Sequence, residues 1–235
     1  MTTRLRIDPD FWFDRATWSA YMAFVLLTGA TLLILLPSSL SIAERPTTPP
    51  DTVLFSAFFV ILYGILAMTL GQEEIDWQER LLWPGSLLHL LARQLLALVL
   101  TLPYWLIFLI AHSLSPFTSL GVLLHFSVYG LVLGLFGWRL ALTRRSEIFQ
   151  FNLKYLSFTL YLIGSFFLPG LNYLNPLWPL DRMLGENRTD WIALFTQSYL
   201  LWAGVGLLFV WWIRRCILRE MIEEGRANGV NVSDN

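Results

Sequence analysis

Residues 120–142 read LGVLLHFSVYGLVLGLFGWRLAL, and Arg139 is the one charged side chain among them. A helix needs about 20 consecutive, mainly apolar residues to cross the hydrocarbon core of a bilayer. Inside that core no water is available to the backbone, so the segment must satisfy its N–H and C=O groups internally as an α-helix. The long side chain of Arg139 can extend from the helix end to water. We therefore predict a transmembrane helix over 120–142.

Similar stretches recur along the chain. Of the 235 residues, 56% are hydrophobic and 14% are charged, whereas a soluble domain carries about 25% charged residues. Windows of about 19 residues place six spans at 17–36, 53–70, 94–112, 120–142, 153–168 and 191–213. The sequence predicts a single transmembrane domain over 1–235. Its other parts are a cytoplasmic tail with an interfacial helix at 1–16, a cytoplasmic loop at 72–93, an extracytoplasmic segment at 169–190 and a cytoplasmic tail at 214–235.

Positive charge is distributed unevenly between the gaps. Of the 16 Lys and Arg residues, only Arg45, Arg182 and Arg188 fall on one side of the six spans. Lys and Arg concentrate in cytoplasmic segments, so the other side is expected to be the cytoplasm. An even number of spans then returns both termini there. We expect an all-α integral membrane protein with six transmembrane helices and both termini cytoplasmic, located in a cell membrane such as the bacterial cytoplasmic (inner) membrane.

Several function classes are disfavoured by missing residues. Few ionisable side chains lie within the predicted spans, with Arg139 and Lys154 near cytoplasmic ends and His112 and His125 near outer ends. Ion-coupled transporters and pumps need buried ionisable groups, so this argues against them. The sequence has no His-Glu-x-x-His or Gly-x-Ser-x-Gly motif, which argues against an intramembrane enzyme. The only lysine, Lys154, is followed by Tyr155, so no phosphate-binding loop is present. We expect no catalytic, cofactor or metal site.

The segment after the second span concentrates acidic residues in a chain poor in charge. Glu73, Glu74, Asp76 and Glu79 lie close together there, before Pro84-Gly85. The pattern is consistent with a short amphipathic helix on the membrane surface, broken at Pro84-Gly85, with its charged side toward a cytosolic partner. A solvated loop without a partner is the alternative.

The same segment resembles the cytoplasmic loop of the ABC-2 type (type 2 ABC exporter) permease family. The resemblance is carried by Glu73-Glu74, then Glu79-Arg80-Leu81-Leu82, then Pro84 before the third span. Asp76-Trp77 stands where many members have a Gly-Thr or Gly-Ser step. In that family the loop is the coupling helix that docks on the ATPase subunit. The resemblance implies an ATPase-partner interface made of Glu73, Glu74, Trp77, Glu79 and Arg80.

Two other segments are similar to parts of the same family. Residues 10–20 resemble its interfacial helix, and residues 169–179 resemble its outer segment of short helices, here with Pro169, Asn175 and Pro176 as an outer gate segment. Gly130, Gly134 and Gly137 are small residues that let helices approach closely, either within one subunit or between two.

The resemblance implies the function of a half-transporter. The chain would be the permease subunit of an ATP-binding cassette exporter, paired with a second permease copy in a homodimer or heterodimer. A cytoplasmic ABC ATPase subunit would bind ATP and Mg, and the substrate would be amphipathic, lipidic or drug-like. The partners expected are thus these subunits and the lipid bilayer, without nucleic acid. The alternatives are a non-transporting membrane scaffold or assembly factor and, third, an intramembrane enzyme.

Overall fold

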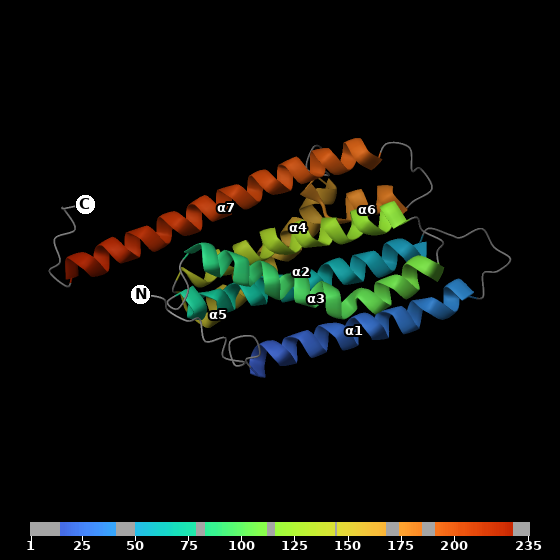
Figure 1. Cartoon of the computed structure of the whole chain (residues 1–235), viewed down its shortest axis with the longest axis horizontal. Helices are drawn as coiled ribbons and strands as arrows, with labels where there is room; N and C mark the ends of the chain where they lie inside the picture. Colours follow the sequence, from blue (N-terminus) through green and yellow to red (C-terminus); the bar gives the residue numbers. More distant parts are fainter. Residues whose placement is uncertain are drawn as a thin grey trace, which may run out of the picture.

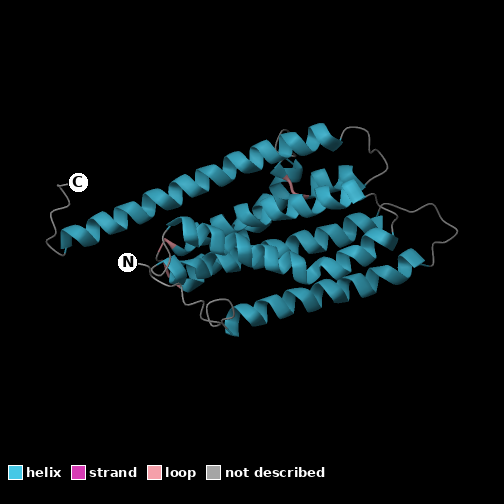
Figure 2. Ribbon diagram, viewed as in Figure 1, coloured by secondary structure: helices cyan, strands magenta, loops and turns pink. Residues whose placement is uncertain are grey.

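The computed structural model describes residues 15–40, 50–78, 83–111, 116–143, 145–167, 174–184 and 191–227. All regular structure in these ranges is helical (Figure 2), which confirms the all-α prediction. The helices are α1 (Arg15–Leu40), α2 (Pro50–Gln78), α3 (Trp83–Ala111), α4 (Pro116–Ala141), α5 (Glu147–Phe167), α6 (Leu177–Leu184) and α7 (Trp191–Ala227).

The long helices lie along one direction, and successive ones run in opposite senses (Figure 1). The short α6 lies at one end of the bundle, beside α7 and α4. At the other end, α1 begins and α7 ends, and the last turns of α7 extend past the neighbouring helices. We call this second end the α1-start end.

Five of the helices, α1, α2, α3, α4 and α7, are long and apolar enough to cross a membrane. The chain is therefore a multi-pass membrane protein. The span predicted at 153–168 corresponds to α5. This helix is not apolar enough to be counted with the five, because its first turns carry the polar side chains of Gln150, Asn152 and Lys154.

The distribution of polar and apolar side chains supports this assignment. Leu33 and Ile110 are 71% and 77% exposed, whereas Glu74 and Arg93 are only 0% and 2% exposed. Large apolar surfaces of this kind mark contact with lipid or with another protein. In water, the same arrangement would expose the apolar side chains and bury the charged ones.

The centre of the bundle is an aromatic layer contributed by α2, α3 and α4. The rings of Phe55, Phe59, Trp105 and Phe126 pack with centroids 4.6 to 5.1 Å apart. Offset and edge-on pairs at these separations are favourable arrangements of aromatic quadrupoles. This layer joins α2, α3 and α4 through side-chain packing.

Glycines bring α2 and α4 into close contact. A Cβ atom at Gly71 would overlap the backbone carbonyl of Gly134, and one at Gly137 would overlap the carbonyl of Met68. Gly130 lies against the ring of Tyr63. Gly130 and Gly137 thus face α2 of the same chain, where their missing side chains allow the backbones to approach. A Cβ atom at Gly134 would first meet Gln94 of α3.

The segment between the second and third spans differs from the expectation. The structure continues α2 to Gln78 and begins α3 at Trp83, so a separate surface helix broken at Pro84-Gly85 is not present in the described residues. Pro84 lies in the first turn of α3, where its missing N–H costs no helical hydrogen bond. The cytoplasmic loop expected at 72–93 is therefore much shorter, and only residues 79–82 separate the two helices.

Candidate functional site

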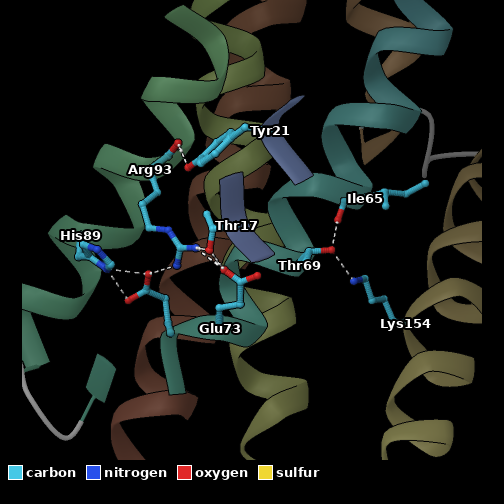
Figure 3. A network of polar contacts seen from close by, with 9 residues as sticks. Thr17, Tyr21, Ile65, Thr69, Glu73, His89, Arg93 and Lys154 are labelled. Atoms are coloured by element: carbon cyan, nitrogen blue, oxygen red, sulfur yellow. Dashed lines mark hydrogen bonds and ion pairs between the residues drawn. The ribbon is translucent and has the colours of Figure 1, made fainter. Parts of the chain in front are cut away.

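A cluster of polar and charged side chains lies inside the α1-start end of the bundle (Figure 3). Helical spacing of three or four residues brings side chains to one face. His89 and Arg93 are paired in this way on α3, as are Thr17 and Tyr21 on α1. Glu73 and Glu74 reach the cluster from the last turns of α2, and we call these six residues the ion-pair cluster.

Glu74 lies at the centre of the ion-pair cluster. His89 Nδ1 lies 2.9 Å from its Oε1 and 3.1 Å from its Oε2, and an Arg93 guanidinium N–H donates to Oε1 over 3.1 Å. The Glu74 side chain is 0% exposed, and those of His89 and Arg93 are 3% exposed. A buried carboxylate is stable only with such partners, so the three side chains act as one unit.

Glu73 and Thr17 extend the cluster to α1. A second N–H of Arg93 donates to Glu73 and, over 2.9 Å, to the Thr17 hydroxyl oxygen. Thr17 in turn donates to Glu73 over 2.7 Å. Tyr21 donates to the backbone carbonyl of Arg93 over 2.8 Å. All of these hydrogen bonds except the one from Tyr21 are charge-assisted. Together they fix the ends of α1, α2 and α3 to one another.

A polar hollow of ≈ 320 Å³ continues the cluster toward α5. Lys154 Nζ donates to Thr69 over 2.7 Å and to Gln72 over 3.0 Å. Glu73 and Glu147 also line this hollow, so both signs of charge are present. No group of His, Cys, Asp and Glu suited to a metal ion occurs among the described residues.

The proposed partner interface is placed differently from the expectation. The carboxylate of Glu74 faces His89 and Arg93 inside the bundle, so in this structure it is not available to a cytosolic protein. Glu73 is 26% exposed, so its carboxylate can bond within the ion-pair cluster and also contact a partner at the surface. The backbone of Trp77 lies in α2. The side chain of Trp77 and all of Glu79 and Arg80 lie outside the described residues, and their contact with a partner stays a prediction.

Asn175 and Pro176, predicted in the outer gate segment, lie at the opposite end of the bundle. The side-chain oxygen of Asn175 accepts the N–H of Leu177 over 2.8 Å and so closes the start of α6. His125 Nε2 donates to the carbonyl of Pro176 over 3.0 Å, which ties α4 to this turn. Pro169 lies outside the described residues.

Replacing Asn175 with alanine is expected to lower the free energy of unfolding by about 1 kcal/mol, because the first turn of α6 loses its acceptor. Thermal unfolding in detergent measures this. Asn175→Ser is the matched control, since a hydroxyl oxygen also accepts from the backbone. Equal losses in both variants would show that the acceptor contributes nothing.

The sequence-based prediction missed that the ion-pair cluster is buried. It assigned Arg93 to a cytoplasmic loop and treated the acidic residues as surface groups. The available signal was the four-residue spacing of His89 and Arg93 next to an apolar run, which places both on one helix face. The residues that His89 and Arg93 contact could not be predicted, because Thr17 and Glu74 come from other helices.

No protein-family model, curated protein or solved structure matches the chain. The fold and the site therefore define its class directly: a multi-pass helical membrane protein with a buried ion-pair cluster at one end of its bundle.

Proposed function

We propose that the chain is the permease subunit of an ATP-binding cassette exporter, which uses ATP hydrolysed by a separate cytoplasmic subunit. The observation that carries the proposal is the ion-pair cluster, which fixes the ends of α1, α2 and α3 at the short connection 79–82. That connection belongs to the segment that resembles the family's coupling helix. A motor docked there would act on three helices at once.

The mechanism follows from the stiffness of this end. Arg93 bonds to Glu73, Glu74 and Thr17, so a push on the α2–α3 connection moves the three helix ends together rather than bending one of them. Rigid-body displacement of packed helices is a common way to open a pathway. In the proposal α5 also crosses the membrane, giving six spans with both termini on the cytoplasmic side. A second copy of the permease completes the pathway.

An apolar pocket supports an amphipathic or lipidic substrate. It has a volume of ≈ 240 Å³ and lies between α2, α4, α5 and α7, and its lining includes Met68, Phe136, Phe158, Trp202 and Phe209. Such a lining suits an acyl chain or a drug-like apolar group and offers little to a free ion.

The proposal is tested by co-purification from native membranes in mild detergent. The wild-type chain is expected to retain an ATPase with a phosphate-binding loop, identified by mass spectrometry, and to hydrolyse no nucleotide alone. Glu79→Gln combined with Arg80→Gln is expected to weaken this association on the order of tenfold, since one lost charge-assisted hydrogen bond amounts to about 1.5 kcal/mol or more.

Glu147→Gln is the matched control, because Glu147 is an exposed acid at the same end of the bundle. It should leave the association unchanged. Retention of a cytosolic protein without a phosphate-binding loop would instead indicate a scaffold or assembly factor, and intrinsic nucleotide hydrolysis would refute the proposal.

An ion-coupled transporter is the second candidate, and the ion-pair cluster itself favours it. The argument from a lack of buried ionisable groups does not hold, because Glu74, His89 and Arg93 are buried inside the bundle. Thr17 lies in the first turn of α1, and Glu73 and Glu74 lie in the last turns of α2. The cluster is therefore near one end of these helices, which suits a structural clamp better than a carrier. Substrate uptake that follows a proton gradient without ATP would favour this candidate.

A further inference from the structure

The end of α7 carries arginines where the helix leaves its apolar part. The span that α7 could place in a membrane is Ser198–Arg219, 22 residues, or about 33 Å at 1.5 Å per residue. The hydrocarbon core is about 30 Å thick. The span is thus slightly longer than the core. Because its last two turns carry Arg214, Arg215 and Arg219, we expect these turns to reach the headgroup region, with Trp211 and Trp212 at the boundary position that tryptophan favours.

These turns form a shallow hollow of ≈ 170 Å³ on one side of α7. Trp211, Arg215 and Arg219 are spaced four residues apart, so they make a single row along the helix. Trp212 and Cys216 line the hollow beside them. Trp211 and Trp212 are 58% and 47% exposed, so the indole rings and the arginines share one open surface, which we call the arginine–tryptophan hollow.

Arg139, at the end of α4, contributes a third guanidinium group next to this hollow. Its guanidinium carbon lies 4.3 Å from the centre of the Trp212 ring, and that of Arg215 lies 5.4 Å from the centre of the Trp211 ring. Stacking on a ring uses the face of a guanidinium group and leaves its edge N–H groups for an acceptor. The Nε atom of Arg139 is buried and has no hydrogen-bond partner among the described residues.

The charge of the hollow is not balanced within the described part of the chain. The ion pairs of the described residues join His89 or Arg93 to Glu73 or Glu74, in the ion-pair cluster. No described carboxylate pairs with Arg139, Arg215 or Arg219. Acidic residues follow in the sequence at Glu220, Glu223 and Glu224, whose side chains are not described. An acceptor with negative charge at the depth of the lipid headgroups would satisfy the three guanidinium groups.

We propose that the arginine–tryptophan hollow binds the headgroup of an anionic phospholipid. The phosphate accepts hydrogen bonds from Arg215 and Arg219, with Arg139 on the α4 side, while Trp211 and Trp212 contact the glycerol region and the first methylenes. The lipid is favoured over a soluble phosphate because the tryptophan rings need an apolar neighbour at the same depth. This inference does not depend on the proposed transport function.

Cys216 provides a reporter for the site, since it is the only cysteine of the chain and lines the hollow. The purified full chain is placed in nanodiscs of phosphatidylcholine, with or without phosphatidylglycerol, and alkylated with uncharged N-ethylmaleimide. A bound headgroup covers the thiol, so phosphatidylglycerol is expected to slow alkylation several-fold.

Two matched variants separate binding from the general effect of a negative membrane on a thiol. Leu218→Cys in a Cys216→Ala background places the thiol at nearly the same depth, outside the hollow, and should show only the general effect. Arg215→Gln is expected to raise the phosphatidylglycerol concentration needed for protection about tenfold, because it removes a charge-assisted hydrogen bond to the phosphate. Arg214→Gln removes the same charge from an exposed neighbour that does not line the hollow and should change protection much less.

The proposal is overturned if phosphatidylglycerol slows alkylation equally at the native thiol of Cys216 and at the thiol introduced by Leu218→Cys. It is also overturned if Arg214→Gln and Arg215→Gln behave alike. Protection by inorganic phosphate in pure phosphatidylcholine nanodiscs would have the same consequence, because the ligand would then be a soluble anion. Failure of ATPase co-purification would leave the lipid result unaffected.

Discussion

Replacing Arg93 with methionine is expected to lower the free energy of unfolding by about 3–5 kcal/mol. Methionine fills a similar volume, but it removes the guanidinium partner of the Glu74 carboxylate, which is 0% exposed. Glu74 then keeps His89 as its partner. Removing one member of a buried ion pair leaves an uncompensated charge, and this is what makes the loss so large. Yield and melting temperature in detergent, followed by fluorescence-detected gel filtration, measure it.

The control and the coupling test use the same end of the bundle. Arg145→Met removes an exposed arginine there and should change stability by no more than about 0.5 kcal/mol. In the double variant Arg93→Met with Glu74→Gln, the buried charge is gone, so the loss should be smaller than the sum of the two single losses. Additive losses would contradict the view that Arg93 and Glu74 act as one unit.

Replacing Gly71 with alanine is expected to give the second largest effect, a loss of about 1–3 kcal/mol in the free energy of unfolding, because overpacking of a tight contact typically costs this much. The added methyl group would overlap the backbone carbonyl of Gly134, and a backbone cannot move aside as a flexible side chain can. The cost should be seen as a lower melting temperature and as loss of the monodisperse gel-filtration peak.

Gly164→Ala and Gly204→Ala provide the matched comparison, because open space surrounds a Cβ atom at either position. Alanine favours helices over glycine by up to about 1 kcal/mol, so these variants should be unchanged or slightly more stable. The sign of the change thus separates the close contact from helix propensity. If Gly71→Ala is as stable as these controls, α2 and α4 are not packed as closely as the structure shows.

The helices of the bundle could be predicted from the sequence wherever a long apolar run identifies them by itself. Apolar runs of about 20 residues located α1, α2, α3, α4 and α7, because length and hydropathy are local properties. The same rule was less informative for α5, whose first turns carry Gln150 and Lys154. The close contact made by Gly134 was expected, but its partner helix could not be chosen from spacing alone.

The ends of α2 and α3 could not be predicted because polar residues have two opposite explanations. Glu74 and Arg93 look like surface residues when each is considered alone. The second span was therefore predicted to end before Glu74, and the third span was predicted to begin after Arg93. Their mutual neutralisation allows both helices to continue. Only the three-dimensional arrangement reveals that Thr17, 76 residues away from Arg93, completes the network.

The order of the ion pairs along the chain has a consequence for biogenesis. Glu74, His89 and Arg93 belong to consecutive helices, so these charges can neutralise one another as soon as the α2–α3 hairpin has been synthesised. A hairpin that enters lipid already neutral avoids most of the cost of inserting isolated charges. Thr17 and Tyr21 lie on α1 and are made earlier, so we expect the hydrogen-bond network to be complete once α3 has been synthesised.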